Sequence, residues 1–390
     1  MKITFDMQAF QSTNRIGGIG KYNYDFLSTL FSLYPDNDYT LVYNQTSQLD
    51  VPLDVRRASR LRSKVIRYFP GNDWNILNQW LYIAGYAQTG SDITHILSPF
   101  EIQSHTVIPN SLLPKNTVIT LYDFIPHLYQ DLYLKGKIAR QHYYKRLNIL
   151  RSASLILAIS EATRQDAIRL FQVPEEKVIN IGIAPSSEYY REESQGTRSD
   201  FIRRKFGIPG NFVLTVSNLD HRKNLKALLK SYSALPAHIR REYPLVLVTN
   251  SSPQHMENDQ DIQQYLNLQE ATFAFKVLYS VTNDELRTLY NLCNLFVFAS
   301  LYEGGGLPVV EAMKCGAPVV AGNTSSIPEF VGRMDNLFDP TNMEEITNAI
   351  EEMLTNEHFR SEIQAYGLEQ AKQITWERVV HRVMQAYQGL

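Results

Sequence analysis

Residues 295–313 contain a short apolar run, a glycine-rich turn and a second apolar stretch, in that order. They read Leu295-Phe-Val-Phe298, then Ala-Ser-Leu-Tyr-Glu303-Gly-Gly-Gly306, then Leu307-Pro-Val-Val-Glu311-Ala-Met313. The first run is typical of a buried strand, and the last stretch predicts a helix that begins at about Leu307. Glycines allow backbone N–H groups to approach a ligand closely, and a helix N-terminus favours an anion such as phosphate. A strand, a ligand-binding loop and a helix are therefore predicted here.

The same alternation of strand and helix extends over the rest of the chain. A glycine loop at 17–20 follows the first β-rich segment, and the apolar residues after it repeat with helical spacing. Further helices are predicted at 135–152 and from Ser160 to about Phe171. Strands that alternate with helices imply a parallel sheet covered on both faces, so the predicted fold class is α/β. The predicted strands are Lys2–Phe10, Tyr39–Tyr43, Ile93–Leu97, Thr117–Leu121, Leu155–Ile159, Phe212–Val216, Leu245–Val248, Phe275–Leu278, Leu295–Phe298 and Ala317–Ala321.

A polar stretch divides the chain into two halves of similar plan. Pro185 to Pro209 includes Glu192-Glu-Ser-Gln-Gly-Thr197 and shows little periodicity, which is typical of a linker between domains. We therefore expect two Rossmann-like domains, at about residues 1–185 and 206–370 of the 390-residue chain. Ligands of such sheets bind beyond the carboxyl ends of the strands, and domain interfaces are preferred pocket sites. The chemistry is expected in these loops, in a cleft between the domains.

Composition excludes several classes of protein. Lys and Arg number 38 against 40 Asp and Glu, so the net charge of −2 argues against a large nucleic-acid footprint. The 2 cysteines, Cys293 and Cys315, are too few for a disulfide framework or a cysteine-based zinc site. No apolar run approaches the ~20 residues of a membrane span, and Asp6 interrupts the N-terminus too early for a secretory signal. A reducing cytoplasm is the expected location.

The two glutamates of the glycine-rich segment, Glu303 and Glu311, are separated by seven residues. Carboxylates beside a phosphate site suit hydrogen bonds from sugar hydroxyls. Together with Gly316-Ala-Pro-Val-Val320 and Ser326-Ile-Pro-Glu329, this pattern resembles the retaining, nucleotide-sugar-dependent glycosyltransferases of family 4. Those enzymes have the GT-B fold, in which two Rossmann-like α/β domains face each other across a cleft.

The resemblance covers nearly the whole chain. It includes the motifs Gly17–Gly20, Ile156–Ser160 and Arg222–Asn224. Two further motifs, Phe5-Asp-Met-Gln8 and Leu121-Tyr-Asp-Phe-Ile-Pro126, are most similar to bacterial O-antigen and polymannan mannosyltransferases. The resemblance also implies that the last helix, around Trp376–Gln388 within residues 374–390, packs back on the first domain.

The resemblance assigns a role to each candidate donor-site residue. Lys223 and Arg222, at a helix start where two cations oppose the helix dipole, would contact the donor diphosphate. The N–H groups of Gly305, Gly306 and Leu307, and the loop at Gly17 and Gly18, would approach the same phosphates. Glu303 would orient the sugar, Glu311 would hold the ribose, and Ser280 and Val281 would receive the base. The alternatives are a solvated basic loop and purely structural glycine turns.

Two positions depart from the family pattern. Tyr122 occupies a position where the family often has histidine, so Asp123 beside it is a candidate sugar or acceptor contact, with a packed aromatic and a turn carboxylate as the alternatives. Asn218 lies where many relatives carry an additional arginine for the diphosphate. Ser160 is expected to be a helix N-cap, and Asp259-Gln-Asp261 is expected to be charge at a helix start rather than a metal site.

The sequence thus predicts an enzyme that transfers a hexose from a nucleoside diphosphate to a hydroxyl with retention of configuration, in polysaccharide synthesis. The resemblance favours mannose from GDP-mannose, with dTDP-rhamnose or a UDP-hexose as alternative donors. The acceptor is expected to be a glycan or a lipid-linked sugar, and no metal or other cofactor is expected. A non-catalytic GT-B protein that binds glycan or protein is the alternative from another class.

A basic run at 56–67 has two interpretations. It contains Arg56, Arg57, Arg60, Arg62, Lys64 and Arg67 among apolar residues. Such a run contacts anionic lipid or a lipid-diphosphate acceptor in some proteins, and in most it is a solvated face. Contact with the inner face of a membrane is therefore an expectation that depends on this segment.

Overall fold

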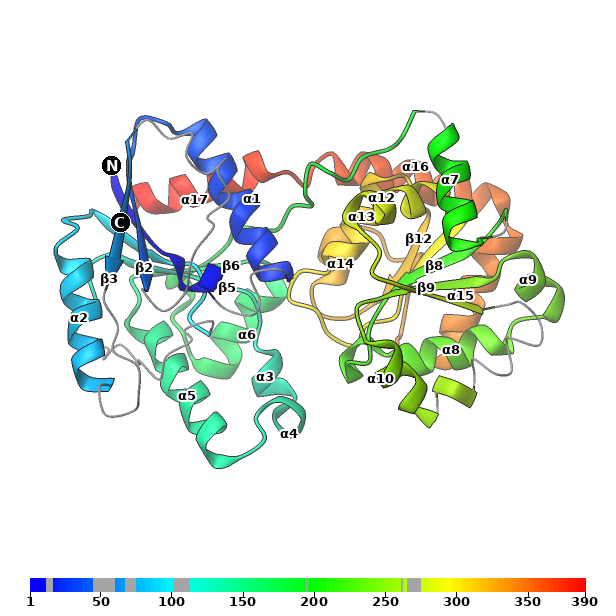
Figure 1. Cartoon of the computed structure of the whole chain (residues 1–390), viewed down its shortest axis with the longest axis horizontal. Helices are drawn as coiled ribbons and strands as arrows, with labels where there is room; N and C mark the ends of the chain where they lie inside the picture. The colour runs from blue at the N-terminus through cyan, green and yellow to red at the C-terminus, as the bar shows by residue number, and fades with distance from the viewer. Residues whose placement is uncertain are drawn as a thin grey trace. The chain divides into compact units, whose positions relative to one another are not determined.

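The computed structural model describes residues 1–11, 17–44, 60–66, 75–100, 113–193, 196–208, 210–260, 262–264 and 275–390. The chain divides into two compact units (Figure 1). Unit 1 consists of Met1–Ala184 together with Trp376–Leu390, and unit 2 consists of Pro185–Thr375. The corresponding predicted domains are 1–185 with the helix at 374–390, and 206–370.

Unit 1 is built on a parallel sheet of seven strands in the order β3-β2-β1-β4-β5-β6-β7. The strand order reverses between β1 and β4, where Phe5 pairs with His95. The bounds are β1 Lys2–Asp6, β2 Asp38–Asn44, β3 Leu61–Ile66, β4 Ile93–Ile96, β5 Thr117–Leu121, β6 Leu155–Ala158 and β7 Val178–Asn180. The predicted strand Lys2–Phe10 is too long, because the chain turns into the 3-10 helix η1 after Asp6.

The helices of unit 1 include the three that the sequence predicts in this half, which are α1, α5 and α6. The predicted helix after the glycine loop is α1, whose buried face includes Tyr22, Phe26 and Leu27. The Ser160 hydroxyl accepts a hydrogen bond from the Thr163 N–H at 3.1 Å, which confirms the predicted N-cap of α6. The bounds are η1 Met7–Gln11, α1 Gly18–Leu33, α2 Asn75–Ala87, α3 Ile125–Leu128, α4 Gln130–Tyr133, α5 Lys137–Ser152, α6 Glu161–Phe171, η6 Glu175–Lys177 and α17 Trp376–Gln388.

The C-terminal helix α17 packs on the first unit through one apolar face. Its Trp376 ring lies edge-on to Tyr22 of α1, with the ring centroids 4.7 Å apart. The Tyr387 hydroxyl lies 2.6 Å from Nδ1 of the buried His95, whose Nε2 lies 2.7 Å from the Thr120 hydroxyl. This chain of hydrogen bonds joins the last helix to the centre of the sheet.

Unit 2 is built on a parallel sheet of six strands in the order β10-β9-β8-β11-β12-β13. The strands are β8 Val213–Val216, β9 Leu245–Thr249, β10 Phe275–Tyr279, β11 Leu295–Phe298, β12 Val319–Gly322 and β13 Leu337–Phe338. The helices are α7 Thr197–Phe206, η7 His221–Lys223, α8 Leu225–Ala234, α9 Ala237–Glu242, α10 Pro253–Asn258, α12 Asn283–Leu292, α13 Leu307–Lys314, α14 Ile327–Val331, α15 Met343–Thr355 and α16 Glu357–Ala371. The helix predicted from Leu307 begins at that residue.

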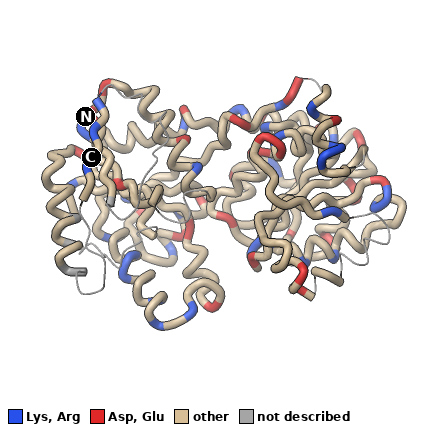
Figure 2. The backbone as a smooth tube through the Cα atoms, viewed as in Figure 1, with Lys and Arg blue, Asp and Glu red and all other residues tan. Residues whose placement is uncertain are grey.

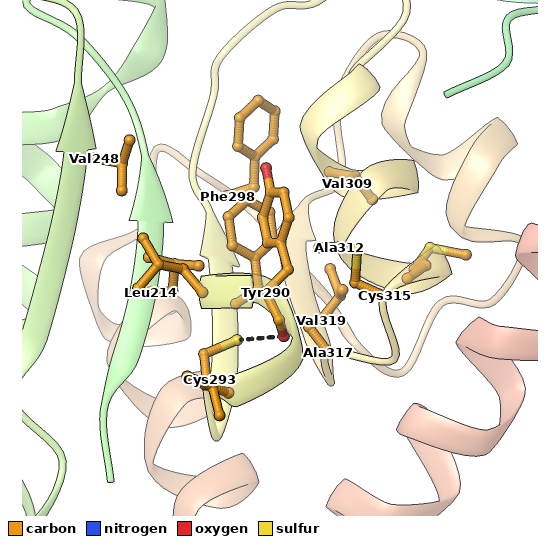
Figure 3. Close-up of a cluster of buried hydrophobic side chains, with 14 of the residues drawn as sticks. Leu214, Val248, Tyr290, Cys293, Phe298, Val309, Ala312, Cys315, Ala317 and Val319 are labelled. Carbon is orange, nitrogen blue, oxygen red and sulfur yellow. Dashed lines mark hydrogen bonds between the residues drawn. The ribbon is translucent and has the colours of Figure 1, made fainter. Parts of the chain in front are cut away.

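The buried core of unit 2 lies on both faces of this sheet. On one face, Leu214 and Val248 of the strands pack with Tyr290 of α12 and Val309 of α13 (Figure 3). The thiol of Cys293 donates to the Tyr290 carbonyl at 3.4 Å, and both cysteines are buried and free. Because this core fixes α13 against the end of β11, it also fixes the glycine turn between them.

Two segments that the sequence pattern assigns to a linker and to a basic run form regular structure. Residues 197–206 lie within the expected linker but form α7, which packs on α12 through ion pairs of Arg198 with Asp284 and Lys205 with Glu285. Residues 61–66 lie within the basic run but form the edge strand β3. The remainder of that run, residues 56–59 and Arg67, lies outside the described residues, as does Asp261. Interactions with other elements, rather than local periodicity, order both segments.

Candidate active site

The candidate site of unit 2 lies where the strand order of its sheet reverses, between β8 and β11. The loop after β8 carries Arg222 and Lys223, and the loop after the adjacent β11 carries Glu303. In parallel sheets the carboxyl ends of strands at such a reversal form a crevice that binds ligands. The residues predicted from separate motifs therefore come from neighbouring strand ends.

Glu303 forms ion pairs with both predicted cations. Its Oε1 lies 2.6 Å from Nζ of Lys223, and its Oε2 lies 2.9 Å from Nη1 of Arg222. The carboxylate side chain is 9% exposed, and those of Lys223 and Arg222 are 15% and 17% exposed. We call these three residues the charge triad. The sequence pattern assigns the cations to a phosphate and the carboxylate to a sugar, and does not predict that they contact one another.

The ionised form of Glu303 is favoured by this environment. Burial acts to raise the pKa of the carboxyl, but the charges of Lys223 and Arg222 outweigh burial and leave the pKa below its usual range. Nζ of Lys223 also lies 5.1 Å from the centre of the Phe298 ring, at the end of β11. The triad is therefore a largely buried group of formal charge +1, and Asp220 approaches it with Oδ2 3.4 Å from Nε of Arg222.

Backbone hydrogen bonds hold the two loops of the triad together. The Leu301 N–H donates to the Arg222 carbonyl at 2.7 Å, and Nη1 of Arg222 donates to the Tyr302 carbonyl at 3.3 Å. Asn224, which has a left-handed φ of 56°, donates through Nδ2 to the carbonyl oxygens of Ala299 at 3.1 Å and Pro340 at 2.7 Å. The triad geometry is thus imposed by the loops and does not depend only on the charged side chains.

Two serines after β12 position the Glu303 backbone. The hydroxyl of Ser325 accepts from the Glu303 N–H at 2.8 Å, and that of Ser326 donates to the Glu303 carbonyl at 3.0 Å. Ser325 has a left-handed φ of 49°, and Ser326 is fully buried. These serines and Asn224 are positioning residues without a predicted role. Asn224 and Ser326 are the residues just before α8 and α14, and these N-cap positions are the signals that could have indicated them.

The N-terminus of α13 presents backbone donors beside the triad. Gly306 occupies the N-cap position with a left-handed φ of 61°, and neither a side-chain cap nor an acidic residue satisfies the first turn. Within the described part of the chain, the N–H groups of Gly305, Gly306 and Leu307 donate to no protein acceptor. Unsatisfied N–H groups and the positive end of the helix dipole together favour an anion. This end of α13 is therefore suited to a phosphate group.

The second glutamate lies one helical turn into α13. Glu311 is 8% exposed, and its Oε2 accepts a hydrogen bond from the Tyr290 hydroxyl at 3.4 Å. Burial is the main cause that raises the pKa of Tyr290, and the Glu311 charge adds to it. Ser280 and Val281 follow the edge strand β10; Ser280 has a left-handed φ of 54°, and Val281 packs on the core of unit 2.

The remaining predicted residues belong to unit 1. Gly17 is the N-cap position of α1 and Gly18 is its first residue, which places both after β1, where that sheet reverses its strand order. Asp123 follows β5, and its Oδ1 accepts from the Ile125 N–H at 2.9 Å. The Tyr122 hydroxyl donates to Oδ1 of the buried Asn23 at 2.7 Å, and its ring packs against Tyr22. Tyr122 is thus a packed aromatic, and Asp123 forms a turn at the start of α3.

Asp259 and Asn218 accept hydrogen bonds from backbone N–H groups of nearby residues. Asp259 accepts from the Ile262 N–H at 3.2 Å and pairs with Lys226 at 3.1 Å, as expected of charge at a helix start. Across the described ranges, no three or more His, Cys, Asp and Glu side chains are grouped as metal ligands. Asn218 accepts from the Asp220 N–H at 3.0 Å and so shapes the loop before the triad.

Comparison with known proteins identifies the family. Residues 198–370, which contain the triad and α13, match the family described as Glycosyl transferases group 1. The O-antigen chain mannosyltransferase B of Escherichia coli is 32% identical over 286 residues, which are 72% of this chain and 73% of that protein. The chain belongs to the group 1 glycosyl transferases.

The full length of this group 1 glycosyl transferase also aligns with a longer relative. It is 30% identical over 406 residues to the serotype-specific mannosyltransferase WbdA of Escherichia coli, covering 100% of this chain and 48% of WbdA. The chain therefore spans about half the length of that relative. The crystal structure of Anabaena HepE in complex with UDP and glucose superposes with a TM-score of 0.74 at 19% identity, covering 100% of both chains. The predicted GT-B fold is confirmed.

Proposed function

We propose that this group 1 glycosyl transferase moves a hexose from a nucleoside-diphosphate sugar to a hydroxyl of a glycan or lipid-linked acceptor, with retention of configuration. The observation that carries the proposal is the charge triad beside the free N–H groups of α13. Lys223 and Arg222 would stabilise the charge that develops on the departing diphosphate, together with the N–H groups of Gly305, Gly306 and Leu307. A single preorganised donor of this kind lowers the activation barrier by on the order of 3 kcal/mol.

Glu303 would have two successive partners in this proposal. In the free protein its carboxylate neutralises the cations at 2.6 and 2.9 Å. When a diphosphate attracts those cations, the carboxylate oxygens would accept hydrogen bonds from sugar hydroxyls instead. Glu311 would bind the ribose hydroxyls from α13, and Ser280 and Val281 would contact the base. In unit 1, Gly17 and Gly18 would approach the donor phosphate and Asp123 would contact the sugar or the acceptor.

We propose GDP-mannose as the donor, because the relatives WbdA and O-antigen chain mannosyltransferase B are named mannosyltransferases. The UDP held by HepE makes a UDP-hexose the alternative, and dTDP-rhamnose would use the same diphosphate contacts. Synthesis of cell-surface polysaccharide, at the cytoplasmic side, is the corresponding process. Neither a metal nor another cofactor is part of the proposed reaction.

The test is a thermal-shift panel of GDP-mannose, dTDP-rhamnose, UDP-glucose and UDP-N-acetylglucosamine on the wild type and Lys223→Ala, followed by NMR of the product made from the stabilising donor. A ligand at 100 times its Kd stabilises a fold by about 2.7 kcal/mol. We expect GDP-mannose alone to stabilise the wild type, the variant to lose this effect, and the product to keep the α configuration. A β product contradicts retention. If no donor raises the melting temperature of the wild type, the protein instead binds glycan or protein without catalysis.

A further inference from the structure

The segment 125–152 of unit 1, which carries α3, α4 and α5, has a charge unlike that of the rest of the protein. It contains six basic residues and one acidic residue, Asp131, whereas the whole chain has a net charge of −2. Helix α5 contains no acidic residue. Figure 2 shows these Lys and Arg positions along α5. The excess of positive charge is therefore local, and the remainder of the protein is acidic.

Large apolar side chains are exposed in the same segment. Ile138 is 70% exposed, Leu132 is 46% exposed and Leu128 is 38% exposed. Tyr133 is 37% exposed, so the short helices α3 and α4 and the start of α5 each present an apolar side chain to solvent. We call Leu128, Leu132, Tyr133, Ile138, Lys135, Lys137, Arg140 and Lys145 the basic-apolar face. Single exposed apolar residues are ordinary, but a group within eleven residues of chain indicates an interaction surface.

The cations of the basic-apolar face are not neutralised by the protein. In the part of the chain that the structure describes, the side chains of Lys135, Lys137, Arg140 and Lys145 form no ion pair and no hydrogen bond. Lys137, Arg140 and Lys145 line a surface hollow of about 500 Å³ together with Tyr144. Ile138 lies between the lining residues Lys137 and Arg140 in the first turn of α5. The face thus combines free cations, a hollow and protruding apolar groups.

Helix α7 of unit 2 provides a contrast within the same chain. It also carries four basic residues and an exposed apolar side chain, Phe201 at 56%. There, however, Arg198 pairs with Asp284 and Lys205 pairs with Glu285. In the described part of the basic run at 56–67, Arg60 lies 3.8 Å from Asp38, and Lys64 donates to the Gly85 carbonyl at 2.8 Å and to Oε1 of Gln88 at 3.0 Å. Composition alone therefore does not distinguish the basic-apolar face; its unpaired cations do.

From these observations we infer that the basic-apolar face binds the surface of a bilayer that contains anionic lipid. Free lysine and arginine side chains attract anionic headgroups, and adjacent Leu, Ile and Tyr side chains enter the boundary between headgroups and acyl chains. Charge complementarity selects this occupant over a protein partner, because lysine is depleted at protein interfaces. No described helix is long and apolar enough to cross a membrane, so the contact would be peripheral.

The experiment measures flotation of the full chain with phosphatidylcholine vesicles that contain 0 or about 40% phosphatidylglycerol, without nucleotide sugar. Each cation near the surface contributes about fivefold to the partition coefficient. We expect binding only to the anionic vesicles, weakened by high salt, about 25-fold weaker for the double variant Lys137→Gln/Lys145→Gln and at least tenfold weaker for Ile138→Glu. The matched control is Arg203→Gln/Arg204→Gln with Phe201→Glu on α7, which should bind as the wild type does.

Each opposite result overturns the inference. Equal binding to neutral vesicles, no binding to anionic vesicles, or an equal loss in the α7 control would each contradict it. If Ile138→Glu converts an oligomer to a monomer in size-exclusion chromatography, the face is a protein interface instead. Unchanged melting temperatures of all variants without donor would show that the folds are intact. Because no donor is present during flotation, its outcome is separate from that of the proposed transfer reaction.

Discussion

Nζ of Lys223 lies 2.6 Å from Oε1 of Glu303, although the two residues are 80 positions apart in the sequence. The carboxylate that is proposed to orient the sugar therefore binds, in the free protein, the cation that is proposed to bind the diphosphate. Its second oxygen binds Arg222 at 2.9 Å. Binding of a donor would exchange these partners, so that the site changes its internal charge contacts when it is filled.

Lys223→Ala should lower kcat by about 10²–10³-fold, because it removes one preorganised donor from the leaving diphosphate. Glu303 retains Arg222 as a partner, so the loss of stability should be smaller than the ~3–5 kcal/mol that follows complete loss of a buried partner. Initial-rate kinetics and urea unfolding measure the two effects. The control is Lys226→Ala, whose ion pair with Asp259 is half exposed. A variant with a wild-type kcat would exclude Lys223 from the reaction.

Glu303→Gln should separate nucleotide binding from transfer. The amide no longer neutralises Lys223 and Arg222, so the free cations should bind GDP as tightly as in the wild type or more tightly. The turnover rate of sugar transfer should fall at least 10²-fold if the carboxylate orients the sugar in the transition state. Calorimetric titration with GDP and turnover measurements test this pair of results. Glu311→Gln, on α13, should instead weaken GDP binding. Loss of GDP binding in Glu303→Gln would contradict the proposed exchange of partners.

Gly306→Ala should destabilise unit 2 through backbone strain. The added Cβ would lie 3.5 Å from Cγ1 of Ile327, an ordinary contact, but φ is +61° at this position. A left-handed residue other than glycine costs about 1–2 kcal/mol. The cost should be seen in urea unfolding, together with weaker donor binding as the N–H groups of α13 move. Gly210→Ala, where the added Cβ has no neighbour within 4 Å, should change stability by less than about 0.5 kcal/mol.

Acidification should destabilise unit 1 through His95. Burial lowers the pKa of His95 to about 3, whereas the unfolded chain binds this proton near pH 6.5. Between these values the unfolded state holds one more proton, so stability falls by about 1.4 kcal/mol for each pH unit of acidification. His95→Asn should be less stable than the wild type at pH 7, because Tyr387 and Thr120 lose a hydrogen-bond partner. Its free energy of unfolding should also decrease less steeply from pH 6 to pH 4. Exposed His358→Asn should keep the wild-type slope; an unchanged slope in His95→Asn would refute the prediction.

The sequence by itself determined the α/β class, ten of the thirteen described strands and the turn that ends at Gly306. It also located α13, which begins at Leu307. The physical reason is that these features depend on local chemistry. These signals act over a few residues and can be recognised in the sequence: apolar runs of strand length, helical spacing of apolar residues and glycines at turns.

The tertiary structure alone decided which charged and polar groups contact one another. The triad forms because β8 and β11 are adjacent strands of one sheet, and the contact of His95 with Tyr387 spans 292 positions. Helix α7 and strand β3 form in polar or basic segments because distant partners, Asp284 and Glu285 for α7 and the edge of β2 for β3, stabilise them. Strand order and cross-chain ion pairs are properties of the folded chain, because local periodicity does not encode them.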